Sequence, residues 1–140
     1  MKSISLPADV REFFDRYRHA FDRLDAEAVA ALYSIPSGIL SGQTYVHWPD
    51  FESVRGNMVA LCEQYRRHGY STASYEAAWT AILGPDALIA DIAWKIEYQN
   101  GQKPSQFHTT YNLRRTDPGW RILLCTAYEE QRLDGSTPTS

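Results

Sequence analysis

The sequence lacks the cysteine content and the short motifs that mark several classes of protein. Its two cysteines, Cys62 and Cys125, are far apart and lie in apolar surroundings, which argues against a disulfide framework or a zinc site. Glycine-rich phosphate loops, HExxH patterns and a Ser/His/Asp order are also missing. We therefore expect reduced thiols in a cytoplasmic protein and neither a cofactor nor a metal.

Long apolar runs and concentrations of positive charge are missing as well. The formal net charge is -3, and no lysine or arginine cluster is long enough to follow a phosphate backbone or an anionic membrane. The first residues contain no continuous apolar segment or cleavage site, and no run approaches membrane length. We expect a soluble protein without a targeting signal and without nucleic acid or membrane partners.

The 140 residues suit one domain, which we place at 1–131, with a disordered tail at 132–140 that has little apolar content. Apolar side chains at spacings of three and four predict a helix over residues 8–24 and another over residues 51–68, which Asp50 caps and Gly69 ends. Asp25 starts a short helix between them that is expected to include Tyr33 and to end near Pro36.

From Tyr70 onward the apolar period changes to two, which is typical of strands. Four strands are predicted, separated by turns at residues 84–86, 100–104 and 117–119. The last one, from Trp120, has apolar residues on both faces under strict alternation, so we expect a partner subunit to cover its outer face and form a homodimer. The expected fold class is α+β, a cone-shaped roll with a curved antiparallel sheet of about six strands on three N-terminal helices.

Helices followed by long hairpins, the stretch RYRHAFDRLDAEAVAALY and a DPGWRI turn resemble the nuclear-transport-factor-2-like superfamily, with its SnoaL-like cyclases and steroid Δ-isomerases. The resemblance covers nearly the whole chain. It implies two oxyanion donors at Tyr17 and Tyr111, and a catalytic base near Ser41. Because serine does not exchange protons near neutral pH, the expected base is missing.

Other candidates come from the residues themselves. Tyr17 and Tyr111 lie on apolar faces, where their hydroxyls either hold a ligand oxygen or hydrogen-bond within an ordinary core. His47, with Asp50 three residues later, is a second candidate for the base, although Asp50 also suits a helix cap. By alternation His108 falls on the outer sheet face, where a dimer contact is expected unless a bulge reverses it.

Aromatic residues suggest the walls of a pocket for a flat or apolar molecule, and equally an ordinary packed core; the residues we select as ligand-binding are Tyr33, Trp79, Trp94 and Phe107. The leading hypothesis is a cofactor-free pocket protein that binds a small, largely apolar or aromatic molecule. Catalysis would then be a proton transfer of the isomerase, lyase or cyclase type. The alternative is an interaction or assembly module with a packed interior.

Overall fold

The computed structural model of the chain describes residues 2–3 and 5–132, and the side chains of residues 5–128. Within these residues the elements are β1 (Lys2–Ser3), α1 (Ala8–Asp22), α2 (Ala26–Ala30), β2 (Tyr33–Ser41), β3 (Thr44–Trp48), α3 (Phe51–Arg67), β4 (Tyr70–Gly84), β5 (Ala87–Tyr98), β6 (Ser105–Thr116) and β7 (Gly119–Arg132). All strands join one sheet in the order β1-β4-β5-β6-β7-β2-β3. The α+β class, with six longer strands and a two-residue β1, is as predicted.

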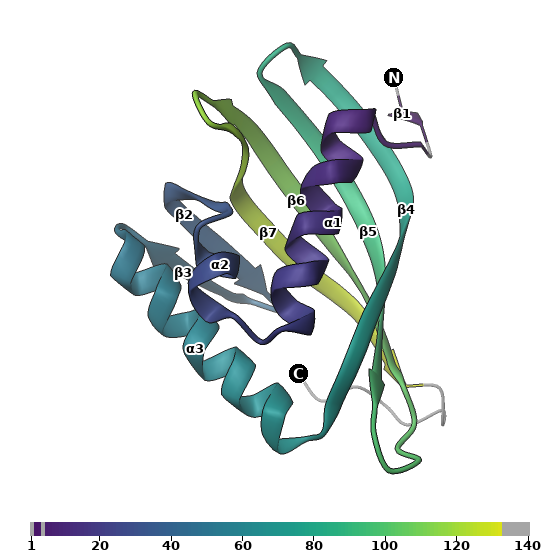
Figure 1. Cartoon of the computed structure of the whole chain (residues 1–140). Coiled ribbons are helices and arrows are strands. Elements are labelled where there is room, and N and C mark those ends of the chain that lie inside the picture. The colour runs from purple at the N-terminus through teal and green to yellow at the C-terminus, as the bar shows by residue number, and fades with distance from the viewer. Residues whose placement is uncertain (1, 4, 133–140) are drawn as a thin grey trace.

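The sheet curves around α1, which lies along its inner face, while α2 and α3 lie beside β2 and β3 (Figure 1). The helix turns a stripe of five apolar side chains toward the sheet: Val10, Phe13, Phe14, Tyr17 and Phe21. On β5 every second residue from Leu88 to Ile96 is buried opposite this stripe. The predicted helix and strand periods therefore meet in one core.

The predicted second helix is too long. Tyr33 belongs to β2 rather than to α2, and Pro36 lies inside that strand after a cis peptide bond. The strand pairs in parallel with β7 and antiparallel with β3, and its register with β7 shifts between Tyr33 and Gly38. Proline fits at such an irregularity because no ladder hydrogen bond needs its missing N–H. Long-range pairing thus decides the conformation of this segment.

Two bulges change which side chains face the core. A register shift between Ala77 and Trp79 in β4 places Trp79 opposite Asp91, on the outer face, so its predicted inward position is wrong. In β7, a shift against Asn112 and Leu113 of β6 places Ile122 and Cys125 on the same inner face. The extra residue between their partners is Leu123, which is exposed.

Strict alternation therefore assigns the residues of β7 to the wrong faces, since the bulge brings the buried ones to one side, while Leu124 still places an apolar side chain on the outer face. A homodimer through the outer sheet face stays a prediction. The predicted tail begins one residue early, because Arg132 still belongs to β7, and residues 133–140 lie outside the described part of the chain. Across residues 2–3 and 5–132, no helix is long and apolar enough to cross a membrane.

Asp22, at the end of α1, fastens the helix to the sheet. Its carboxylate accepts hydrogen bonds from the Tyr70 hydroxyl at 2.7 Å, the Ala73 backbone N–H at 3.1 Å and the Arg18 guanidinium at 2.9 Å. Tyr70 and Ala73 are buried, so their donors have little access to water as an alternative. This one carboxylate fixes where the helix ends relative to β4.

Replacing Asp22→Ala should lower the free energy of unfolding by about 2 to 3 kcal/mol, because it leaves two buried donors without an acceptor. Urea denaturation measures this change. Glu12→Ala is the matched control on the same helix, since Glu12 contributes an exposed 3.8 Å ion pair with Arg16, and its effect should stay below about 0.5 kcal/mol. Equal losses of unfolding free energy in the two variants would contradict the role of Asp22 in joining α1 to β4.

Candidate functional site

A cavity of about 160 Å³ lies between α1, α3 and the inner face of the sheet. Most of its lining is apolar or aromatic: Tyr17, Phe21, Tyr33, Ile39, Met58, Leu61, Tyr65, Tyr70, Ala73, Trp94, Ile96, Phe107, Tyr111, Cys125 and Ala127. Two further lining residues are polar. Thr109 is buried on β6, whereas Asn57 is exposed on α3 and marks the side on which the cavity meets the surface.

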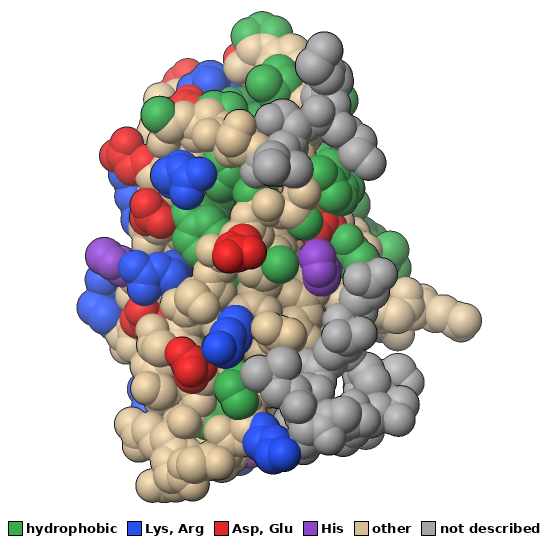
Figure 2. Space-filling view, turned by 90° about the vertical axis from the view of Figure 1, so that its right-hand side faces the viewer, with side chains coloured by type: hydrophobic (Ala, Val, Ile, Leu, Met, Phe, Trp, Pro, Cys, Tyr) green, Lys and Arg blue, Asp and Glu red, His purple; other side chains and the backbone are tan. Residues whose placement is uncertain are grey.

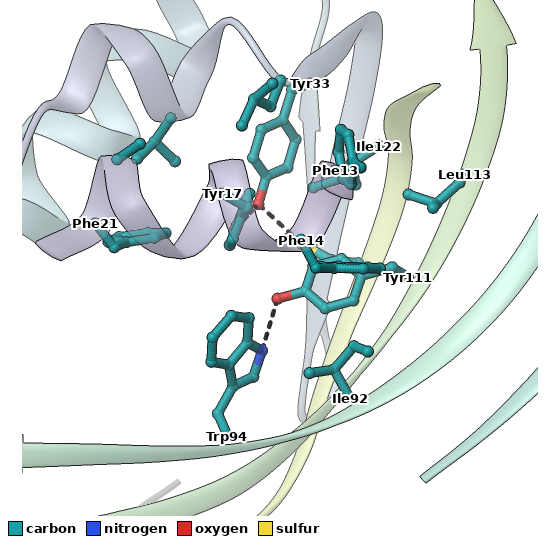
Figure 3. Packing of buried hydrophobic residues seen from close by; sticks show 14 of the residues in the cluster. Phe13, Phe14, Tyr17, Phe21, Tyr33, Ile92, Trp94, Tyr111, Leu113 and Ile122 are labelled. Atoms are coloured by element: carbon teal, nitrogen blue, oxygen red, sulfur yellow. Dashed lines mark hydrogen bonds between the residues drawn. The ribbon is translucent and has the colours of Figure 1, made fainter. Parts of the chain in front are cut away.

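The buried hydroxyls in this cavity are joined by hydrogen bonds. Tyr17 and Tyr33 share one at 2.8 Å between their hydroxyl oxygens, and Tyr33 is 3.8 Å from the Cys125 sulfur. On the other side, the Trp94 indole N–H donates to the Tyr111 hydroxyl at 3.0 Å (Figure 3). Tyr111 accepts that bond and directs its own hydroxyl proton toward Tyr17, since, beyond the effect of burial, the contact raises the pKa of Tyr111 and acts to lower that of Tyr17.

These groups are neutral hydrogen-bonding groups rather than acids or bases. Burial, and then the neighbouring tyrosines and cysteine, raise the pKa values of Tyr17, Tyr33 and Tyr111 well above the ordinary value for tyrosine. Burial also raises the pKa of the Cys125 thiol to about 12, so it is not a thiolate near neutral pH. The cavity can donate hydrogen bonds, but these groups do not take up protons.

The raised pKa values predict that the protein becomes less stable in alkali. Above about pH 10 the tyrosines of the unfolded chain ionise while the buried ones stay protonated, so the free energy of unfolding falls as pH rises. Tyr17→Phe removes one of the buried tyrosines that stay protonated, so the free energy of unfolding should decrease less steeply with pH in this variant. The exposed Tyr45 gives the control, as Tyr45→Phe should leave the fall unchanged. Denaturation series across pH test this; identical slopes in both variants would contradict it.

Five of the residues selected from the sequence lie around this cavity, and three do not. Tyr17, Tyr33, Trp94, Phe107 and Tyr111 line it. The other three are Trp79, His47 and Asp50. The bulge in β4 turns Trp79 to the outer face, and the two residues expected to supply a base lie near the start of α3.

His47 is exposed on the edge strand β3, where its Nδ1 pairs with the Tyr45 hydroxyl at 3.2 Å. Asp50 accepts from the Ser53 backbone N–H at 2.8 Å and from the Ser53 hydroxyl, which hold the pKa of its carboxyl below the ordinary value. It is the cap of α3, and neither residue lines the cavity. Ser41 is exposed at the end of β2. The cavity lining thus contains no Asp, Glu or His among the residues described.

Several wall residues do not follow from sequence reasoning. Asn57, Leu61 and Tyr65 lie along one side of α3 because of their i, i+4 spacing, yet the sequence gives no sign that this side borders a cavity. Strict alternation puts Cys125 and Ile122 on opposite faces of β7, whereas the bulge brings both to the inner face. The bulge contains no glycine or proline, so the sequence does not indicate it. Alternation does place Thr109 on the inward face of β6, and only its contact with the cavity is unforeseen.

Sequence reasoning also passes over a polar cluster on the outer sheet face. Asp91 of β5 is completely buried, and its carboxylate accepts from His108 Nδ1 at 2.7 Å, Thr110 Oγ1 at 2.6 Å and the Tyr128 hydroxyl. Burial alone would raise the pKa of Asp91, but the three hydrogen bonds outweigh it, so the pKa of this carboxyl lies below its ordinary value. His108 faces outward as predicted, since β5 and β6 pair without a shift.

Comparisons with known proteins agree with this architecture. Residues 8–130 match the model of a family described as NTF2-like protein (DUF6841). Among curated proteins, none matches the chain in sequence. An NTF-2-like protein of unknown function from Shewanella oneidensis has a TM-score of 0.70 at 13% identity, with 86% of this chain and 97% of the other covered.

Two further solved structures have similar folds and different names. A ketosteroid isomerase-like protein from Erwinia carotovora atroseptica has a TM-score of 0.67 at 16% identity, covering 90% of this chain and 95% of its own. A protein named as a putative calcium/calmodulin-dependent protein kinase type II association domain, from Thiobacillus denitrificans, has a TM-score of 0.69 at 14% identity, covering 85% and 94%. At these identities the likeness establishes the fold alone.

Proposed function

Since the chain belongs to the family described as NTF2-like protein (DUF6841), we propose that it uses the inner cavity to bind a small, neutral, largely apolar molecule that carries one hydrogen-bond acceptor. The observation that carries this proposal is the composition of the wall: aromatic and aliphatic side chains surround a few uncharged donors. Pockets for small molecules commonly combine an apolar lining with a few placed polar groups.

The volume limits the size of the ligand. About 160 Å³ is close to the roughly 150 Å³ of an engineered apolar cavity in another protein that binds benzene. It is well below the roughly 300 Å³ at which drug-sized pockets begin. A molecule with one ring therefore matches the cavity, and a multi-ring molecule does not.

The electrostatics of the wall limit the charge of the ligand. Lysine, arginine and histidine are missing from the described lining residues, so a bound carboxylate would lose its hydration without gaining a counter-charge. A neutral carbonyl oxygen avoids this cost and accepts the hydroxyl proton of Tyr111 in place of Tyr17. The ligand class that results is a one-ring aldehyde, ketone or amide.

Proton-transfer catalysis has less support than binding. General acid–base catalysis needs a group that exchanges protons near the working pH and reaches the substrate. The tyrosine pKa values are raised, and His47 and Asp50 lie away from the cavity. We therefore propose binding without isomerisation. The two free, buried cysteines support the cytoplasmic location that we propose for this activity.

An assembly module is the second candidate. The small volume of the cavity favours it, as does the likeness to a structure named as an association domain. In that case the cavity is a packing defect of the core and has no ligand. Direct measurement of ligand binding separates the two candidates.

Calorimetric titration with benzene, benzaldehyde and benzoate tests the proposal. Benzaldehyde should bind, benzene should bind more weakly because it accepts no hydrogen bond, and benzoate should not bind. Tyr111→Phe should weaken benzaldehyde binding about three- to tenfold, the effect of losing one hydrogen bond, and leave benzene binding unchanged.

Tyr45→Phe is the control, since that hydroxyl is exposed on β3. Circular dichroism should show that both variants remain folded. If none of the three compounds binds in saturable fashion at millimolar concentration, the cavity is not a ligand site and the assembly candidate is favoured.

A further inference from the structure

The Asp91 cluster borders a groove on the outer face of the sheet, on the opposite side from the cavity. The groove has a volume of about 370 Å³ and crosses β4, β5 and β6. We call it the outer groove and define it by its outward-facing residues: Ser74, Glu76, Ala93, Lys95, Gln106 and His108. Figure 2, turned toward this side of the molecule, shows acidic, basic and histidine side chains interspersed on the surface.

Asp91 decides which nitrogen of His108 carries the proton. An ionised carboxylate only accepts hydrogen bonds, so the 2.7 Å contact with Nδ1 requires that Nδ1 be the donor. The neutral ring then has its lone pair on Nε2. That nitrogen has no hydrogen bond to any residue from 5 to 128, and the His108 side chain is 31% exposed. The groove therefore contains a hydrogen-bond acceptor, His108 Nε2, and the buried Asp91 carboxylate fixes its orientation through the opposite nitrogen of the ring.

The groove also contains a cation. Lys95 lines the groove and takes part in none of the ion pairs found within 4.0 Å among the described residues. It pairs across the sheet with Gln106, and His108 is two residues further along the same strand, so Lys95 and His108 are diagonal neighbours. Side chains in that relation are separated by about 7–8 Å and come within reach of one another when one is long.

The remaining charge in the groove limits the orientation of a ligand. Glu76 pairs with Ala93 on the side away from His108, which places it two strands, or about 10 Å, from the histidine. Ser74 pairs with Lys95, so Glu76 is also a diagonal neighbour of Lys95, on the β4 side of it. An anionic group is therefore favoured on the β6 side of Lys95, next to Gln106 and away from Glu76. The small side chain of Ala93 leaves the floor open between these groups.

We propose that the outer groove is a second small-molecule site, which takes a small anion that carries a hydroxyl group, of the 2-hydroxy carboxylate class. Lys95 binds the carboxylate, and His108 Nε2 accepts the hydroxyl hydrogen. Asp91 is a positioning residue, because it sets the tautomer of His108 and does not itself reach the ligand. The outer groove shares the wall residues Trp94 and Phe107 with the inner cavity, but its polar side chains lie on the opposite face of the sheet.

Glycolate and acetate are suitable probes because they differ only by the hydroxyl group. In NMR titrations of the full chain, glycolate should bind about three- to tenfold more tightly than acetate, as expected for one added hydrogen bond. Lys95→Gln should weaken both ligands about tenfold, since it removes the charge-assisted bond. Lys103→Gln is the matched control, because Lys103 lies in the exposed loop after β5, and it should change neither affinity.

Asp91→Asn tests the positioning role. The asparagine amide can donate to Nδ1, which moves the ring proton to Nε2 and turns the acceptor into a donor. Nitrogen-15 shifts of the ring should report this tautomer change, and the preference for glycolate over acetate should disappear. A purely structural Asp91 would alter stability without moving the tautomer. If this variant does not fold, His108→Phe should abolish the same preference while acetate binding persists.

Three results would overturn the proposal. Equal affinity of the wild-type protein for glycolate and acetate, or no binding of either at millimolar concentration, would contradict the proposed 2-hydroxy carboxylate class of ligand. Equal behaviour of Lys95→Gln and Lys103→Gln would remove the anion contact. A proton on Nε2 of wild-type His108 would remove the acceptor.

Discussion

Hydroxyl groups buried in an apolar interior need hydrogen-bond partners, and the arrangement of this protein's core depends on that requirement. Tyr17 from α1 meets Tyr33 from β2, and Tyr111 from β6 meets Trp94 from β5. The Tyr17–Tyr33 bond joins α1 to β2 and so helps to fix the position of the helix on the sheet, whereas the Trp94–Tyr111 bond joins the neighbouring strands β5 and β6. The same bonds leave a small volume of apolar walls and uncharged donors, which is the basis of the proposed ligand class.

The two faces of the sheet carry different chemistry because successive strand residues point in opposite directions. On β5, Ala90, Ile92 and Trp94 face the core, while Asp91 faces outward. Carboxylates and histidines are missing from the described wall of the inner cavity, yet on the outer face a buried carboxylate holds a histidine. Groups able to exchange protons are thus separated from the cavity, which favours binding over isomerisation inside it.

Strong local periodicity makes the central elements predictable. The stripe of α1 and the alternation of β5 and β6 are enough to place Tyr17, Trp94, Phe107 and Tyr111 on the correct side. Trp79 and the last strand are misplaced by alternation, because one extra residue in a strand reverses every later side chain and these bulges contain no glycine or proline. Tyr33 is wrongly predicted to be helical because pairing with β7, far along the chain, determines its conformation.

The sequence by itself determined the fold class and the apolar character of the interior, since hydrophobic periods of 3.6 and 2 are local properties of the chain. It also determined the absence of a recognisable phosphate or metal motif. Only the tertiary structure decided that the tyrosine hydroxyls are linked, that His47 and Asp50 lie outside the cavity, and that Asp91 orients His108. Those relations join residues across strand registers and packed layers, and a register is fixed only when the whole sheet has assembled.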